Sequence, residues 1–442
     1  MRTPQVIDVE DPEEVVERVA AVDVAKASGK VCTRVPNPTT GRRITKVWDV
    51  GTTTRAVMDL ADELTHQRIE RVVVESTSDY WRPFVYLLEA RGLVVWLVNA
   101  RDVKQVPGRP KTDKLDAVWL AKLNERGMLR SSFVPPAEIR QLRDYTRLRV
   151  DLVEERTRHK QRVEKLLEDA LIKLSTVATD IFGKSGRSML DALVAGERDP
   201  EVLADLALGK MRPKRAALRD ALTGRFDQHH AELLSLLLEE IDALSAKIDR
   251  LTVRAGQLLA EMPGAAAPSA LPASGGGTAP LDAVARLDEI TGIGTTAAQI
   301  IIAEVGLDMA QFPTPGHLVS WAKLSPRSVQ SGARNRPAKT GKGNPYLKRV
   351  LAEAAASTAR TDTFLGDRYR RLARRRGKLK AVVAVARSIL VIVWHLLADP
   401  MARFHDLGAD FYIQTVHTQR RTRNLVHQLE VLGHRVTLTP AA

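Results

Sequence analysis

The chain has 442 residues, of which 44% are hydrophobic and 27% are charged, and its formal net charge is +14 at pH 7. This length suits two or three domains, and the composition is typical of a soluble globular protein. The positive charge favours a polyanionic partner, meaning nucleic acid or an acidic membrane surface. Because Cys32 is the only cysteine, the composition excludes a disulfide framework and a multi-cysteine zinc site.

The sequence gives little reason to expect a membrane protein. No apolar run approaches the roughly 20 residues of a membrane span, and the best candidate, residues 381–397, is interrupted by Arg387 and His395. The acidic stretch at residues 8–14 lacks the apolar core of a signal peptide. We therefore expect a cytoplasmic protein that has no membrane partner.

The first third of the chain alternates between strand and helix patterns. Apolar, β-branched runs predict five strands, at residues 19–24, 31–35, 44–50, 69–74 and 93–98. Helical spacing predicts helices at residues 52–67 and 80–90, and a third helix that begins near Asp113. Three strands followed by alternating helices and strands indicate an α/β domain built on a mixed sheet.

Four carboxylates are the candidate chemical groups of this region. Asp113 and Asp116 are three residues apart, so both lie on one face of a helix, although this spacing is also common on solvated helix faces. Asp23 lies in an apolar strand, where an unpaired carboxylate is costly, whereas Glu75 follows a strand and could simply face solvent. If the four converge, they repel one another unless cations neutralise them. Two magnesium ions would do so, and such a pair is suited to phosphoryl transfer.

Three segments carry a family resemblance: AVDVAK at residues 21–26, VESTSDYW at 74–81 and KTDKLDA at 111–117. They resemble the N-terminal domain of DEDD-type insertion-sequence transposases, here called the one-ten family. The resemblance implies an RNase H-like fold, similar to Holliday-junction resolvases, in which Asp23, Glu75, Asp113 and Asp116 are the metal ligands and catalytic carboxylates. This chain has Ala21-Val22 where the family often has Gly-Ile, and Ser78-Asp79 where it often has Thr-Gly. Neither departure removes a carboxylate.

The middle of the chain is predicted to be helical. Residues 137–174 form a charged helix with seven arginines between positions 140 and 162, which would either bind phosphates or form a solvated face. Leucine, isoleucine and alanine then recur in steps of three and four from Leu234 to Leu258. This heptad seam predicts a long helix that forms a coiled coil within or between chains, or is buried in an intramolecular bundle. Residues 263–280 carry no charge and read as a flexible linker.

The C-terminal third holds the candidate nucleic-acid contacts. Residues 287–298 have the form of a helix-hairpin-helix, in which Gly292 and Gly294 permit a tight turn, although such glycines often mark only a turn. Residues 327–349 hold seven Lys or Arg and no acid, in what reads as a loop, and residues 360–380 hold nine basic and two acidic residues. These runs are predicted to contact phosphates or, alternatively, to be solvated faces. The candidate contacts are Arg327, Arg334, Arg336, Lys339, Lys342, Arg374, Arg375 and Arg376.

Helices are expected at residues 346–359, 380–397 and 422–429, and a short strand at 435–438. Ser331 lies in the basic loop, where the cations would stabilise a developing phosphorane charge, but by residue type alone it is an ordinary loop serine. The block from Trp321 through Gly332 to GNPYL at 343–347 resembles the C-terminal domain of the same transposase family. Its nucleophilic serine then corresponds to Ser331, and Ser325 and Ser328 are the neighbours most easily mistaken for it.

The family resemblance implies a magnesium-dependent recombinase with a covalent phosphoserine–DNA intermediate. It further implies a composite site, with the carboxylates of one subunit beside the serine of another, and a structured bridge RNA that pairs with donor and target DNA. The heptad seam suggests a dimer or a tetramer. Two alternatives remain: a metal-dependent DNA junction nuclease without a serine step, and a non-catalytic DNA-binding protein.

The expected architecture is multidomain, α/β followed by α. It consists of an RNase H-like DEDD domain (15–136), a helical or coiled-coil region (137–262), a linker (263–280), a mainly α serine transposase domain with a helix-hairpin-helix (281–420), and a tail (421–442).

Overall fold

A computed structural model describes residues 15–75, 78–99, 113–268, 281–326, 328–331, 334–337, 340–412 and 418–438. Of residues 113–114, 328–331, 334–337 and 418–421 it describes the backbone alone. The chain divides into two compact units, Met1–Val134 and Pro135–Ala442.

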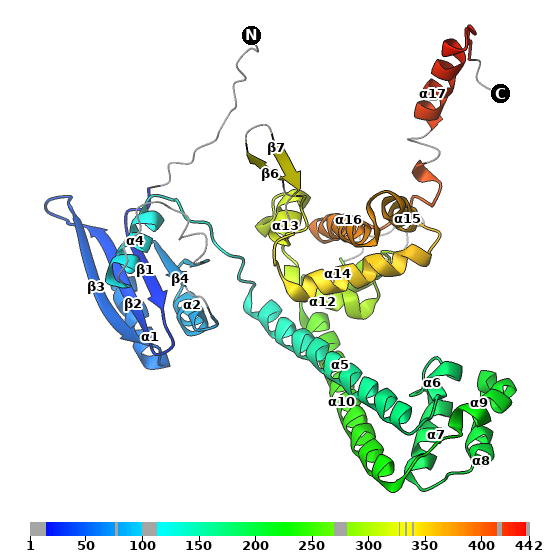
Figure 1. Cartoon of the computed structure of the whole chain (residues 1–442). Helices are drawn as coiled ribbons and strands as arrows, with labels where there is room; N and C mark the ends of the chain where they lie inside the picture. Colours follow the sequence, from blue (N-terminus) through cyan, green and yellow to red (C-terminus); the bar gives the residue numbers. More distant parts are fainter. Residues whose placement is uncertain are drawn as a thin grey trace. The chain divides into compact units, whose positions relative to one another are not determined.

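The first unit is built on a five-stranded sheet of order β3-β2-β1-β4-β5 (Figure 1). Its strands are β1 (Val19–Val24), β2 (Ser28–Pro36), β3 (Arg43–Gly51), β4 (Arg71–Glu75) and β5 (Val95–Val98). The pairs β1–β2 and β2–β3 are antiparallel, whereas β1–β4 and β4–β5 are parallel. This confirms the predicted α/β order and mixed sheet.

Helices cover both faces of the sheet. The helices α1 (Thr54–His66) and α2 (Trp81–Ala90) share one hydrophobic core with Ala20, Val22 and Val24 of β1. The helix α4 (Asp113–Glu125) shares a second core with Ala21 of β1 and Val73 of β4. Because side chains alternate across a strand, odd-numbered residues of β1 and β4 face α4. Asp23 and Glu75 are odd-numbered, so their side chains lie on the face of the sheet that α4 covers.

The second unit begins with a long helical pair. The helix α5 (Ala137–Asp169) packs lengthwise against α10 (Gln228–Glu261) in antiparallel orientation (Figure 1). The predicted seam is the packed face of α10, where Leu234, Ile241, Leu244 and Ile248 are buried. The pairing seen is therefore within the chain. Short helices between the two close a further core; they are α6 (Leu174–Val177), α7 (Lys184–Val194), α8 (Pro200–Asp205), η1 (Gly209–Lys214) and α9 (Arg215–Leu222).

The remainder of this unit is mainly helical, with one hairpin. Its elements are α11 (Ala283–Asp288), α12 (Thr295–Val305), η2 (Met309–Gln311), α13 (Pro315–Trp321), β6 (Ser328–Ser331), β7 (Arg334–Pro337), α14 (Pro345–Ser357), η3 (Thr358–Arg360), α15 (Phe364–Arg376), α16 (Lys378–Ala398) and α17 (Thr418–Val431). The helix α16 is the centre of this region, since it contacts α11, α13, α14 and α15.

The expectation about the apolar segment that forms α16 needs correction. Among the described helices, α16 is long and apolar enough to cross a membrane, although no such run was expected. Its buried residues, among them Ala381, Val385 and Ile389, form one stripe at helical spacing. That stripe packs against neighbouring helices, so the composition of α16 is explained as that of a core helix.

Two further predictions differ from the structure. The basic segment after Pro326 was expected to be a loop, but β6 and β7 form an antiparallel hairpin, with Val329 supplying β-propensity. Residues 435–438 were expected to form a strand, but they have no regular structure. In the predicted linker, Ala265 is buried and its carbonyl accepts a hydrogen bond from Ala283 N–H at 2.9 Å, whereas residues 269–280 lie outside the described residues.

Candidate active site

Two of the candidate carboxylates are direct neighbours across two parallel strands. Asp23 of β1 is the register partner of Glu75 of β4. Adjacent strands lie about 4.8 Å apart, and register partners point to the same side of the sheet. Both residues have the parity of Ala21 and Val73, so both side chains point to the face that α4 covers. Glu75 is buried, with 6% of its surface exposed, and Asp23 is half-buried.

The other two candidate residues, Asp113 and Asp116, lie in the first turn of α4. Its buried residues Ala117, Leu120 and Ala121 pack on the sheet. Asp113 and Asp116 each lie four residues before one of them, so they extend the same stripe by one turn toward the helix N-terminus. Asp116 is half-buried, and for Asp113 the backbone position alone is described.

Buried polar contacts fix the position of α4 along the sheet. The Asn124 amide Nδ2 donates to the carbonyl oxygens of Ala20 (3.1 Å) and Arg71 (3.2 Å), and Asn124 Oδ1 accepts from Arg71 Nε at 2.7 Å. The Arg71 guanidinium in turn lies 4.0 Å from the centre of the Trp96 ring. The C-terminal end of α4 is therefore clamped to the beginnings of β1 and β4. We call this set of contacts the Asn124 clamp.

Because the clamp fixes one end of α4, it allows positions along α4 to be compared with positions along β1 and β4. Counting back from Asn124, Asp116 lies about 12 Å along the helix at 1.5 Å per residue. Asp23 lies about 10 Å beyond Ala20, and Glu75 about 13 Å beyond Arg71, at about 3.3 Å per strand residue. For a helix that runs antiparallel to these strands, these estimates predict that Asp116 lies level with the Asp23–Glu75 pair.

The candidate carboxylates near the ends of β1 and β4 are suited to a hard cation. Carboxylate oxygens are the ligands that magnesium prefers. Cys32 packs into the core beneath α4, where burial raises the pKa of its thiol to about 11, and a soft thiol is not a ligand that magnesium prefers. Asp23, Glu75, Asp113 and Asp116 remain the candidate ligands of such a cation.

Another group of metal-ligating residue types lies in the second unit. Among the described residues, ligand atoms of Asp169, His229 and His230 lie within 4.8 Å of one another. His230 Nδ1 accepts a hydrogen bond from Asp227 N–H at 3.1 Å, so its proton must reside on Nε2, which faces Asp169 Oδ2 at 3.1 Å. Both ring nitrogens are therefore occupied in joining the end of α5 to the start of α10, which explains this group without a metal.

Ser331 lies at the tip of the β6–β7 hairpin. It is the last residue of β6, and its register partner is Arg334, the first residue of β7. Arg336 is the partner of Val329, and Lys342 is exposed beyond the hairpin. Arg327 and Lys339 lie outside the described residues. The hairpin thus brings Ser331 next to the backbone of a basic strand.

The predicted helix-hairpin-helix corresponds to α11, a turn and α12. Gly292 has φ +89°, and a Cβ there would lie 2.6 Å from the carbonyl oxygen of Ala354, so only glycine fits. Gly294 is the N-cap residue of α12, and both glycines are exposed with the threonines that follow. The start of α12 is accordingly open to solvent.

The basic run on α15 and α16 divides into two parts. Arg368, Arg370 and Arg371 are used internally: Arg371 lies 3.6 Å from the centre of the Tyr412 ring, Arg368 donates to Tyr412 Oη, and Arg370 donates to Thr361 O. The corner between the helices is different. We call it the basic tip, and it consists of the exposed residues Arg374, Arg375, Arg376, Lys378 and Lys380. Within the described part of the chain, no ion pair involves them.

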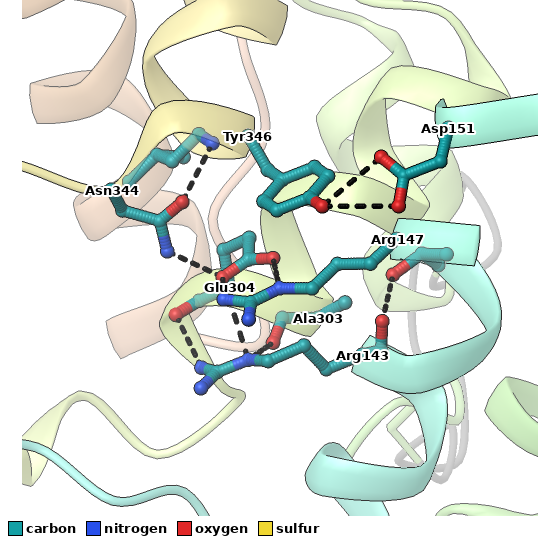
Figure 2. A network of polar contacts seen from close by, with 9 residues as sticks. Arg143, Arg147, Asp151, Ala303, Glu304, Asn344 and Tyr346 are labelled. Atoms are coloured by element: carbon teal, nitrogen blue, oxygen red, sulfur yellow. Dashed lines mark hydrogen bonds and ion pairs between the residues drawn. The ribbon is translucent and has the colours of Figure 1, made fainter. Parts of the chain in front are cut away.

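The α5 arginines were expected to bind phosphates or to be solvated, and several do neither. Arg147 pairs with Glu304, Arg149 donates to Gln299 at 2.7 Å, and Arg156 donates to Ser245 at 3.1 Å. Sequence reasoning also missed Glu304, which is fully buried on α12 (Figure 2). A lone acid within an apolar helix was the available signal, comparable to the lone acid in an apolar strand that marked Asp23.

Two family models and a curated relative match parts of this chain. A family model described as a transposase of the DEDD IS110 type matches residues 20–172, which include all four carboxylates. A second model, described as the transposase IS116/IS110/IS902 family, matches residues 284–370, which include Gly292, Gly294 and Ser331. An insertion element IS110 uncharacterized 43.6 kDa protein of Streptomyces coelicolor is 32% identical over 116 residues. That match covers 26% of this chain and 28% of the relative.

Proposed function

This chain belongs to the IS110 family of transposases, and from that premise we propose that it cuts and rejoins DNA at the ends of an insertion sequence. The reaction uses magnesium held by the first unit and a serine nucleophile carried by the second. The observation that carries the proposal is the register of Asp23 against Glu75, on the face that α4 covers.

In this proposal Asp23, Glu75, Asp113 and Asp116 bind the metal ions. Bound magnesium would offset the charge of the carboxylates and polarise the scissile phosphate. The Asn124 clamp fixes the C-terminal end of α4 on the sheet, and in this proposal it thereby holds Asp116 beside the strand pair. A buried Glu75 also helps to exclude water from one side of the site.

Ser331 is the proposed nucleophile. Its Oγ forms a bond to phosphorus while the bond from phosphorus to the leaving sugar oxygen breaks. The serine proton passes to a base at the carboxylate site, and the leaving oxygen takes up a proton. The resulting phosphoserine ester conserves the energy of the broken bond, so a hydroxyl of the other DNA strand reverses the step and rejoins the backbone. Arg334 and Arg336 supply positive charge beside the developing phosphorane.

The partners in this proposal are donor DNA, target DNA and a structured guide RNA. The net charge of +14 and the basic tip provide the electrostatic attraction. The turn at Gly292 and Gly294 offers backbone N–H groups to a phosphate. The carboxylates of one subunit act beside the serine of another, so the active assembly is a dimer or a tetramer.

The test is trapping of a covalent protein–DNA adduct. Full-length protein is incubated with element-end DNA and magnesium, denatured, and separated on a denaturing gel. The adduct should be lost in Ser331→Ala but retained in Ser325→Ala and Ser328→Ala. An adduct that survives in Ser331→Ala would refute the assignment of the nucleophile.

A junction nuclease is the second candidate, favoured by the fact that all four carboxylates belong to one unit and need no serine to hold metal. It predicts magnesium-dependent strand breakage that persists in Ser331→Ala without any adduct. The third candidate, a non-catalytic DNA-binding protein, predicts binding without breakage under any metal.

A further inference from the structure

The second unit contains a buried carboxylate that the proposed reaction does not use. Glu304 has none of its surface exposed and lies in α12, whose other buried residues are mostly aliphatic. Removing a carboxylate from water costs several kcal/mol unless charged partners and hydrogen bonds compensate it. A residue retained at that cost calls for an explanation in the contacts that it makes.

Two arginines of α5 compensate the charge (Figure 2). Arg147 donates from Nε to Glu304 Oε1 at 2.7 Å and from Nη2 to Oε2 at 2.8 Å, in a bidentate pair. Burial alone would lower the pKa of Arg147, but the hydrogen bonds and charge of Glu304 raise it above its usual value. Arg143 Nε lies 3.4 Å from Glu304 Oε2, and Arg143 donates to the carbonyl oxygens of Ala303 and Glu304 at 2.9 Å each. These contacts bind α12 to α5.

The same carboxylate also holds the start of α14. The Asn344 amide Nδ2 donates to Glu304 Oε2, while Asn344 Oδ1 accepts from Leu347 N–H at 3.1 Å and so caps α14. Two residues further on, Tyr346 Oη donates to Asp151 of α5 at 3.0 Å, and the Arg147 guanidinium lies 4.9 Å from the Tyr346 ring centre. Asn344 therefore has one fixed orientation, with its donor on Glu304 and its acceptor on α14.

The residues just before Asn344 lie against the end of α13, from which the chain leads into the hairpin that carries Ser331. Gly343 has φ +57°, and a Cβ on it would lie 2.7 Å from the carbonyl oxygen of Ala322. Gly341 packs on the Lys323 side chain, and the Lys348 ammonium donates to the carbonyl oxygen of Gly341. The chain thus leaves α13 at Ala322, forms the hairpin, and returns to touch its own starting point.

We propose that Glu304 is a positioning residue for Ser331. It acts through Asn344, which fixes the return strand at the hairpin base and thereby fixes the direction in which the hairpin points. The inference rests on the proposed function for the role of Ser331 as nucleophile. The anchoring of the hairpin base by Glu304 is a separate claim, because it does not depend on any reaction.

Two substitutions test the anchor. Glu304→Gln keeps the shape of the side chain but removes the charge that Arg143 and Arg147 require. Asn344→Ser keeps an oxygen that can cap α14, but the side chain is one bond shorter and withdraws its donor from Glu304. A matched control is Asp242→Asn, which breaks another bidentate arginine pair of the same unit, Arg187 to Asp242 at 2.6 and 2.7 Å.

For each variant, three quantities are measured: the rate of adduct formation, the affinity for DNA and the midpoint of thermal unfolding. Glu304→Gln and Asn344→Ser should slow adduct formation by about 10- to 100-fold, as expected when a reacting group is misplaced by an ångström. Their DNA affinity should stay within about twofold of wild type, because the basic tip is untouched. Asp242→Asn should react at the wild-type rate. Equal rates in Glu304→Gln and wild type would overturn the proposal.

A pH dependence distinguishes positioning from loss of stability. In Asn344→Asp an ionised carboxylate would repel Glu304, whereas a protonated one donates a hydrogen bond to it. The adduct rate of Asn344→Asp, divided by the wild-type rate at the same pH, should therefore recover as the pH falls toward 5. A ratio that does not change with pH would contradict the role of the Asn344 donor.

Hydrogen exchange separates failure of this inference from failure of the proposed function. Backbone amides of residues 346–348 should exchange faster in Glu304→Gln and Asn344→Ser than in wild type, whether or not an adduct forms. Ser331→Ala should leave that exchange unchanged. Unchanged exchange in both anchor variants would refute the anchor, even if Ser331 proves to be the nucleophile.

Discussion

The Asn124 clamp is predicted to be the main determinant of where α4 lies on the sheet. Asn124→Leu keeps a similar volume but removes the acceptor of Arg71 Nε and the donors to the carbonyl oxygens of Ala20 and Arg71. The hydrogen bond to a charged group contributes about 1.5–3 kcal/mol and each neutral bond about 1 kcal/mol. The substitution should therefore destabilise the α4–sheet contact by about 3–5 kcal/mol.

Native-state hydrogen exchange, resolved by peptide, is the appropriate measurement, because a chain with two compact units does not unfold in one step. Protection should fall in α4 and β4 and stay unchanged in α5 and α10. Lys122→Ala, an exposed position of the same helix, serves as the control and should alter protection by less than about 0.5 kcal/mol. Wild-type protection of α4 in Asn124→Leu would refute the idea that the clamp sets the position of Asp116.

Three further outcomes follow from the described side chains. Glu75→Gln and Asp116→Asn should abolish magnesium-dependent cleavage and the rise in thermal midpoint on adding magnesium, while DNA binding stays intact. The control Asp49→Asn, on the exposed strand β3, should leave all three properties unchanged. Alanine at the three arginines of the basic tip should weaken binding to all DNA sequences. The slope of the logarithm of the binding constant against the logarithm of salt concentration should become shallower by about 0.9 for each phosphate that the variant no longer neutralises. Burial raises the pKa of Cys32 from 9.0 to about 11, so its folded form binds the proton more tightly and stability should fall as pH rises from 9 to 11. Unfolding measured across that range should lose this slope in Cys32→Ala.

Local pattern was sufficient for much of the fold. The apolar run Val19–Val24 predicted β1 with its observed bounds, and the spacing from Leu234 to Leu258 predicted the packed face of α10. In both cases a single repeating period decides which side chains are buried. The carboxylates Asp23 and Asp116 stood out for a related reason, since each interrupts or precedes an apolar face.

The rest depends on contacts between distant segments. Arg147 and Glu304 are 157 positions apart, and although Glu304 is a lone acid in an apolar helix, nothing near it in sequence identifies Arg147 as its partner. Asn124 has no special spacing, and its importance comes from carbonyl groups on two strands. The strands around Ser331 lie among glycines and prolines that by themselves indicate a loop, and pairing across the hairpin outweighs that preference.

The central claim is that Ser331 attacks DNA in a reaction that the four carboxylates support. The most direct test is mass-spectrometric mapping of the nucleotide attached to protein after reaction with element-end DNA and magnesium. We expect the attached nucleotide on Ser331 in the wild type and no attached nucleotide in Asp23→Asn. Attachment at Ser325 or Ser328, or undiminished attachment in Asp23→Asn, would contradict it.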